Sequence, residues 1–348
     1  MKHFRISFLV SFVCLAVAAW WGYQKGGLTG ALSALGIAVI LSVMEVSLSF
    51  DNAVVNASVL KTWDAFWQKL FLGVGIIIAV FGMRIVFPLL IVVIAAKIGP
   101  IAAIQLAAAD PEGYAAIMND AHLPIAAFGG TFLMMVALSY FFDEHKEIHW
   151  VHAIESRASR YASIKGLEIA FVLTVALIFS RFLPQGAERS TFIMCVVYGL
   201  LTFLLVEVLG AFLDKSQETT DAAVKGGLGA FLYLEVLDAS FSFDGVIGAF
   251  ALTQNLFIIA IGLGIGAMYV RSMTIMLVER GTLAEYRYLE HGAFYAILVL
   301  SVIMYVQTIY HVPEVITGLG GACLIGIALW SSIRWNRANP NASAHDAG

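Results

Sequence analysis

Charged residues are scarce in this sequence. Only 13% of its 348 residues are Asp, Glu, Lys or Arg, whereas 60% are hydrophobic and the mean hydropathy is +0.87. A soluble domain carries about 25% charged residues, so the composition excludes an ordinary water-soluble protein and places the chain in a bilayer. The formal net charge of −4 is too small to indicate nucleic acid or a strongly acidic partner.

Cysteine is also rare. Cys14, Cys195 and Cys323 lie far apart in apolar runs and show no CxxC spacing. This pattern indicates neither a disulfide framework nor a thiolate metal site. We expect these residues to be small apolar packing residues.

Long apolar runs dominate the sequence, and they predict about ten transmembrane helices of about 17–25 residues. The first run follows Lys2 and Arg5 and is long enough for a transmembrane helix rather than a signal peptide. The stretch 97–122 is expected to be an external loop with a short surface helix, and 336–348 a disordered tail. The ten runs are approximately 6–23, 28–58, 68–96, 123–142, 165–183, 190–213, 226–252, 255–278, 289–310 and 313–333.

Lys and Arg are unevenly distributed between the predicted loops. With the N-terminus inside, 14 of the 20 lie in inner segments and 4 in outer segments, while Arg84 and Arg271 lie within helices. The positive-inside rule expects this asymmetry. The bias predicts an even number of spans with both termini cytoplasmic.

Two acidic segments, 45–52 and 238–245, lie inside the second and seventh runs and align without a gap. Glu45 aligns with Asp238, and Asp51 with Asp244. Carboxylates at membrane depth are costly and indicate a functional site by default. The doubled motif predicts one site built from two copies of one design.

The repeat extends beyond the acids. Arg84 and Arg271 each lie one run after an acidic segment, and each is the only arginine in its run. An offset of five spans inverts the second copy, as in many secondary transporters. We therefore predict an all-α polytopic helix bundle, with a single transmembrane domain over 1–335 and halves of about 1–183 and 184–335.

Each acidic segment carries a turn signal. Asp51-Asn52 and Asp244-Gly245 have the residue types of turns and helix N-caps. Nearby serines can satisfy freed backbone groups. The second and seventh helices are therefore predicted to be broken, with an aspartate at each break.

The predicted ligands contain oxygen only, which suits Mg²⁺, Ca²⁺ or Mn²⁺ better than zinc or copper. No tightly bound cofactor is expected; the cation is the cargo. The metal ligands are Glu45, Asp51, Asn52, Glu235, Asp238 and Asp244, with Ser49, Ser242, Arg84 and Arg271 in support.

A structural ion network is the alternative. The five motif acids and Glu207 outnumber Arg84 and Arg271, and unpaired buried charges are prohibitive. The site therefore needs cations, protons or both. The arginines either neutralise the empty site or hold helix ends. Histidines in the loop 143–152 are candidates for metal binding or pH sensing, but a solvated connector is expected there.

The doubled Ser-Phe-Asp-Asn and Ser-Phe-Asp-Gly motifs, with the segment 288–293, resemble the TerC-like integral membrane proteins of the superfamily that includes the LysE-type exporters. The stretches 45–59 and 81–88 look more specifically like the domain-of-unknown-function 475 branch. The resemblance covers about 28–333. The extra first run and the stretch 97–122 depart from the usual pattern.

The resemblance implies efflux of a divalent cation, with Mn²⁺ as the expected cargo, at the bacterial cytoplasmic membrane. Asp51 and Asp244 carry over as functional acids, with Glu45 and Asp238 less securely. Protons are possible coupling ions. Alternatives are a membrane scaffold in metal delivery or in tellurium and stress resistance, or an intramembrane aspartic hydrolase. The GxGD context of such hydrolases is absent, so no enzyme is expected.

Overall fold

The computed structural model describes residues 2–339 except 76, 144, 145, 147, 162, 163, 165, 218–226 and 311. This part of the chain contains helices and no strand, so the all-α prediction is confirmed. The elements are η1 (Lys2–Phe4), α1 (Arg5–Leu48), α2 (Phe50–Leu60), α3 (Ala65–Leu70), η2 (Phe71–Gly75), η3 (Ile78–Val86), α4 (Phe87–Ala96), α5 (Pro100–Ala109), α6 (Pro111–Asp120), α7 (His122–Phe141), α8 (His152–Arg160), α9 (Leu167–Ser180), α10 (Ala187–Gln217), α11 (Leu228–Leu252), α12 (Leu256–Glu279), α13 (Thr282–Glu285), α14 (Leu289–Gln307) and α15 (Glu314–Ala338).

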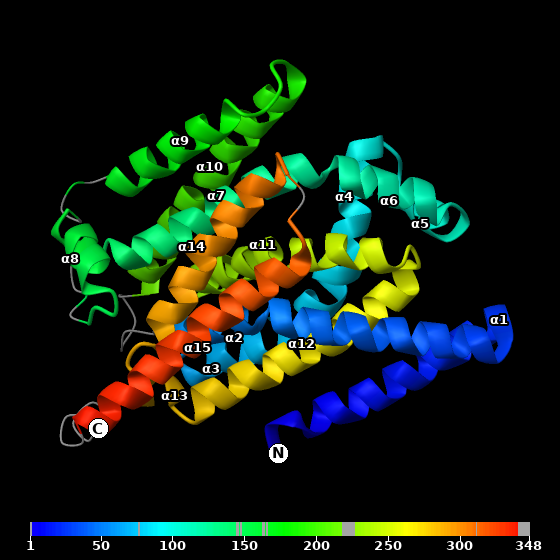
Figure 1. Cartoon of the computed structure of the whole chain (residues 1–348), viewed down its shortest axis with the longest axis horizontal. Coiled ribbons are helices and arrows are strands. Elements are labelled where there is room, and N and C mark those ends of the chain that lie inside the picture. Colours follow the sequence, from blue (N-terminus) through cyan, green and yellow to red (C-terminus); the bar gives the residue numbers. More distant parts are fainter. Residues whose placement is uncertain are drawn as a thin grey trace.

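The first two apolar runs form a helical hairpin within α1. Gly26 and Gly27 leave helical geometry, and Gly27 has a φ of +60°, which glycine adopts at little cost. The chain reverses there, and the two limbs lie side by side (Figure 1). The second limb packs along α12, where Gly262 lets Leu41 approach: a Cβ at that glycine would lie 2.5 Å from the Cβ of Leu41.

The second and third runs both depart from a straight α-helix. The predicted break in the second run is confirmed, since α1 ends at Leu48 and α2 begins at Phe50, with Ser49 at φ −106° and ψ 15°. The third run is π-helical over η2 and η3. Such wide turns are rare and occur most often at functional sites.

The centre of the bundle is formed by α7 and α14, which pack along each other and bury Phe132, Met134, Ile297 and Met304 completely. The helix α2 packs against α12 and α14, while α11 packs against η3 and α7. These paired contacts fit the predicted repeat. Its division near residue 183 stays a prediction.

Six helices in the described part of the chain are long and apolar enough to cross a bilayer, or seven if Phe81–Ala96 and Pro100–Ala109, bent by 103°, form one broken span. The chain is therefore a multi-pass membrane protein. Fewer helices than the ten predicted runs qualify as candidate spans, because α1 contains two runs, α9 has only 14 residues, and α11 carries three acids.

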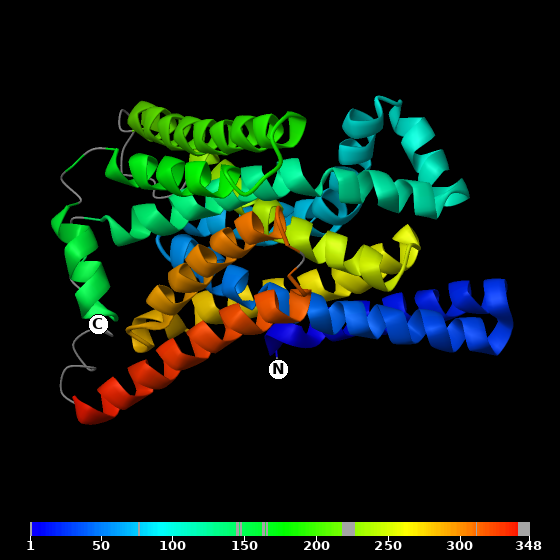
Figure 2. The same cartoon turned by 45° about the horizontal axis from the view of Figure 1, so that its top comes forward.

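The predicted loops sort to two ends of the bundle. Figures 1 and 2 show α8 and the C-terminal end of α15 at one end, and α5 with the α1 turn at the other. Which end faces the cytoplasm stays a prediction.

Two predictions are corrected. The stretch 97–122 forms the helices α5 and α6, not a loop, because Tyr114 and Met118 are buried and pack in one apolar cluster with Phe250 of α11. The helix α15 continues to Ala338, three residues into the predicted tail 336–348; residues 340–348 lie outside the described residues.

Candidate cation site

A cavity of about 40 Å³, lined by both polar and apolar residues, lies between α2, the π-helical third run, α11 and α12. Its volume exceeds the ~10–15 Å³ that one water molecule needs. Five predicted residues line it, together with two polar residues that the sequence analysis missed, Asn56 and Thr274. The five are Asn52, Asp238, Ser242, Arg84 and Arg271.

The two acidic segments meet at Asp238 of α11. Its Oδ1 accepts hydrogen bonds from the side-chain Nδ2 atoms of Asn52, at 2.7 Å, and Asn56, at 2.9 Å. The two asparagines are four residues apart, so they share one face of α2. That spacing was a signal for Asn56 in the sequence.

Glu45 lies beside the cavity at the end of α1 and is 1% exposed. Its Oε1 accepts hydrogen bonds from Arg84 Nη2, in a buried ion pair, and from Ser49 Oγ at 3.1 Å. Small residues on α11 and α12 make room for this side chain. A Cβ at Gly245 would lie 2.8 Å from Glu45 Oε2, and one at Gly266 would collide with Glu45 Cβ.

Asp51 occupies the first turn of α2 and is 5% exposed. Its Oδ1 accepts a hydrogen bond from the backbone N–H of Asn52 at 2.9 Å. The break at Ser49 frees this N–H from the helix, and the carboxylate replaces the lost carbonyl. The other oxygen, Oδ2, faces Gly321 of α15, where a Cβ would lie 3.2 Å away.

Several buried oxygens have no hydrogen-bond partner among the described residues: Asn52 Oδ1, Asn56 Oδ1, and both carboxylate oxygens of Glu235. The asparagines line the cavity. Glu235 lies behind Gly75, another lining residue, at whose position a Cβ would be 2.9 Å from Glu235 Oε1. Buried polar atoms of this kind need a partner.

The remaining predicted residues have different environments. Arg271 Nε donates to the carbonyl of Leu72, which belongs to the π-helix η2, at 2.5 Å. Ser242 lines the cavity. The side chain of Asp244 lies outside the described residues. Glu207 of α10 is exposed and does not belong to the buried acids.

The predicted break in the seventh helix is wrong. α11 is continuous from Leu228 to Leu252. The sequence Asp244-Gly245 has the residue types of a turn, but Gly245 lies inside the helix, where its lack of a Cβ accommodates Glu45. A tertiary contact, not a turn, explains this glycine.

No group of three His, Cys, Asp or Glu side chains in the described part of the chain could hold a metal ion. The carboxylates are separated, with Glu45 on Arg84, Asp238 on two asparagines and Asp51 facing α15. A cation in the cavity would therefore also need amide, hydroxyl or backbone oxygens. These hard donors fit an oxygen-preferring divalent cation.

Fold and cavity together define a multi-pass α-helical membrane protein with a buried acidic site. The chain matches the family model described as "Protein of unknown function (DUF475)" over residues 50–339, and it belongs to this family. The match agrees with the branch named from the sequence motifs. The wider placement with TerC-like and LysE-type proteins stays a prediction. Searches of curated proteins and of solved structures found no match.

Proposed function

We propose that this protein transports a divalent metal cation across the bacterial cytoplasmic membrane, exporting Mn²⁺, with both termini in the cytoplasm. The observation that carries the proposal is the set of buried oxygens on Asn52, Asn56 and Glu235 that lack partners among the described residues. The two asparagines line the cavity where the two acidic segments meet, and Glu235 lies behind its lining residue Gly75. A cation satisfies several such oxygens at once, whereas an apolar occupant satisfies none.

The balance of buried charges supports the same proposal. Glu45, Asp51, Glu235 and Asp238 are buried. Arginines 84 and 271 are too few to neutralise these four acids, and unpaired buried charges are prohibitive. The excess negative charge favours a divalent cation or protons.

Arg84 has a defined part in this proposal. In the present conformation its guanidinium neutralises Glu45 at the cavity wall. An arriving cation replaces Arg84 as the counter-charge, and its departure lets the arginine or protons return. Metal ligands exchange metal for protons, which provides coupling to a proton gradient.

Transport of Mn²⁺ into proteoliposomes, with a fluorescent indicator inside, tests the function. We expect flux by the parent protein and loss of flux in Asp238→Asn. That variant replaces the carboxylate at which the two segments meet by a neutral amide. Ser240→Ala is the matched control, since Ser240 lies on the same helix and donates only to the Val236 carbonyl at 2.9 Å. Equal flux in parent and Asp238→Asn would rule out the site, and no flux in the parent would rule out transport.

Ion preference is tested separately by thermal unfolding of the purified protein with Mn²⁺, Mg²⁺, Ca²⁺ or Zn²⁺. A ligand that binds the folded state raises the unfolding temperature by mass action. We expect the largest rise with Mn²⁺. A larger rise with Zn²⁺, reduced by removing a histidine, would contradict the oxygen-only site.

A further inference from the structure

The short helix α8 (His152–Arg160) lies outside the membrane-spanning helices, at one end of the bundle. Figure 2 shows it running across the direction of α7 and α9, which precede and follow it in the chain. α9 begins at Leu167, so only a short connection follows Arg160. The connections to the spanning helix α7 and to the shorter apolar helix α9 hold α8 near the level where those helices end.

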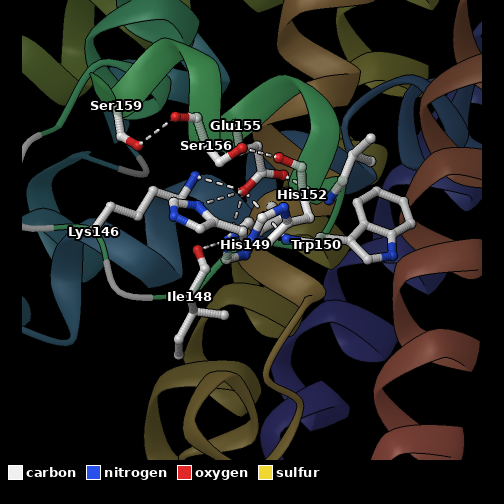
Figure 3. Close-up of polar contacts among 10 residues, drawn as sticks. Lys146, Ile148, His149, Trp150, His152, Glu155, Ser156 and Ser159 are labelled. Carbon is white, nitrogen blue, oxygen red and sulfur yellow. Dashed lines mark hydrogen bonds and ion pairs between the residues drawn. The ribbon is translucent and has the colours of Figure 1, made fainter. Parts of the chain in front are cut away.

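One face of α8 is anchored to the bundle through Glu155, whose side chain is fully buried. Its Oε2 lies 3.3 Å from Lys146 Nζ and 3.3 Å from Nε2 of His291 on α14. The backbone N–H groups of Trp150 and Val151 donate to the same carboxylate at 3.2 and 3.1 Å. Figure 3 shows Lys146 and Trp150 converging on Glu155. Lys146, His149 and Trp150 of the loop 143–152 thus pack around a buried acid, unlike the solvated connector that the sequence predicted.

The carboxyl of Glu155 has a lowered pKa. Burial raises the pKa of Glu155, but hydrogen bonds from His291 and Val151 and the charge of Lys146 outweigh it and lower the pKa to about 2. Glu155 is therefore ionised whenever the protein works. His149 Nδ1 lies 3.6 Å from the same oxygen. The orientation of α8 about its axis is fixed by this cluster.

The opposite face of α8 is basic and bordered by large apolar side chains. At 100° per residue, Arg157 and Arg160 lie about 200° and 140° around the helix from Glu155. Both are exposed. Ile154 and Tyr161 border them and are 59% and 52% exposed. Cations beside apolar side chains are the pattern of a helix that lies in a membrane interface.

We propose that α8 binds anionic phospholipid headgroups of the membrane in which the protein sits. Arg157 and Arg160 contact headgroup phosphates, while Ile154 and Tyr161 enter the boundary of the acyl region. Charge complementarity and the position of α8 between the ends of the apolar helices α7 and α9 favour this occupant. The interaction does not depend on the proposed transport function.

The arginines also have a local role, since they lie in the last turn, where positive charge stabilises a helix. Arg157 Nη1 additionally donates to the Ala153 carbonyl at 2.5 Å. A local role would be the same in every lipid. The dependence on lipid charge therefore separates the two explanations.

The test uses the full chain in nanodiscs of phosphatidylcholine, with or without phosphatidylglycerol, and measures hydrogen–deuterium exchange over 152–161. We expect exchange to slow by about fivefold or more when phosphatidylglycerol is present. Arg157→Gln/Arg160→Gln should lose this difference, whereas Arg157→Lys/Arg160→Lys should keep it. Arg181→Gln/Arg337→Gln, which removes the same charge from exposed positions elsewhere, should behave like the parent.

Three results would overturn the proposal. The first is equal exchange in the two kinds of nanodisc. The second is a lipid dependence that survives in Arg157→Gln/Arg160→Gln. The third is equal protection by soluble glycerophosphate in phosphatidylcholine nanodiscs, which would assign α8 to free anions. The unfolding temperature in phosphatidylcholine alone verifies that each variant folds.

Discussion

The two acidic segments share a sequence pattern but not a structure. In the first, the helix breaks at Ser49, and the freed N–H of Asn52 turns to Asp51. In the second, α11 runs through without a break. Similar local sequences therefore adopt two different backbone conformations. The difference lies in what packs against each segment.

The aligned positions show how the copies have divided their roles. With Glu45 opposite Asp238, Asn52 falls opposite Gly245, and Asn56 falls opposite Ala249. The first copy thus supplies amides to the cavity, while the second supplies small residues, of which the glycine makes room for Glu45. Both copies therefore supply polar groups to the cavity, since Asp238 and Ser242 of the second copy also line it, and the second copy in addition makes room for Glu45.

The two arginines provide the strongest test of this division. Arg84→Met leaves the buried Glu45 carboxylate without its arginine, and we expect the free energy of unfolding to fall by about 3–5 kcal/mol. Arg271→Met loses a single bond to a carbonyl, and we expect a fall of about 1–2 kcal/mol. Chemical unfolding in detergent measures both. Adding Glu45→Gln should restore part of the first loss, and equal losses for the two arginines would remove the asymmetry.

Glu155, a buried acid outside both segments, provides a comparison for the buried ion pair of Glu45. Glu155→Gln removes the charge that anchors α8, at an expected cost of about 2–3 kcal/mol. The pKa of Glu155 is lowered from 4.5 to about 2, so its contribution is complete above pH 4.5 and is lost as the pH falls toward 2. Exchange over 152–161 should rise across that interval in the parent but not in the variant. A parent profile without that rise would contradict the anchor.

Gly245 tests the room that the second copy provides. Gly245→Ala places a Cβ 2.8 Å from Glu45 Oε2, and we expect a loss of about 1–3 kcal/mol. Gly326→Ala in α15 is the control, because nothing lies within 4 Å of its Cβ position, and alanine should stabilise that helix by about 0.5–1 kcal/mol. Thermal unfolding compares the two variants. Similar changes in unfolding temperature for the two variants would mean that α11 shifts easily to accommodate a Cβ beside Glu45.

Glu235 gives the smallest expected change in stability. Its carboxylate accepts no hydrogen bond from the described residues, so Glu235→Gln should alter the free energy of unfolding by less than about 1 kcal/mol in metal-free buffer. Asp238→Asn weakens its two bonds from asparagines and should cost about 1–3 kcal/mol. Both variants should reduce stabilisation by Mn²⁺. An unchanged metal response in Glu235→Gln would remove it from the site.

The sequence predicted those features of the fold that depend on residues close together in the chain. The apolar runs predicted the helices because buried or membrane-exposed backbone must bond to itself. The Asp51-Asn52 pair correctly marked the break in the second run. The same signal failed at Gly245, because the glycine is explained by the side chain of Glu45, 200 residues earlier in the sequence.

Other features depended on partners that a single sequence does not reveal. Glu155 lies among basic residues on a short helix, and only the folded chain brings His291 to it. Asn56 was missed, although its spacing from Asn52 places both on one face of α2. The π-helical third run contains no proline within η3, and its single glycine, Gly82, does not by itself predict five-residue bonding.

Arg84 lies within the π-helix η3, whose turns contain more residues than those of an α-helix. At the end of this element the N–H of Phe87 donates to the carbonyl of Gly82, five residues back instead of four. If one such turn closed to four-residue bonding, the surplus residue would pass along the helix, and the side chains it passed would rotate by up to about 100°. Such a rotation would turn Arg84 away from Glu45 without a hinge or a domain movement.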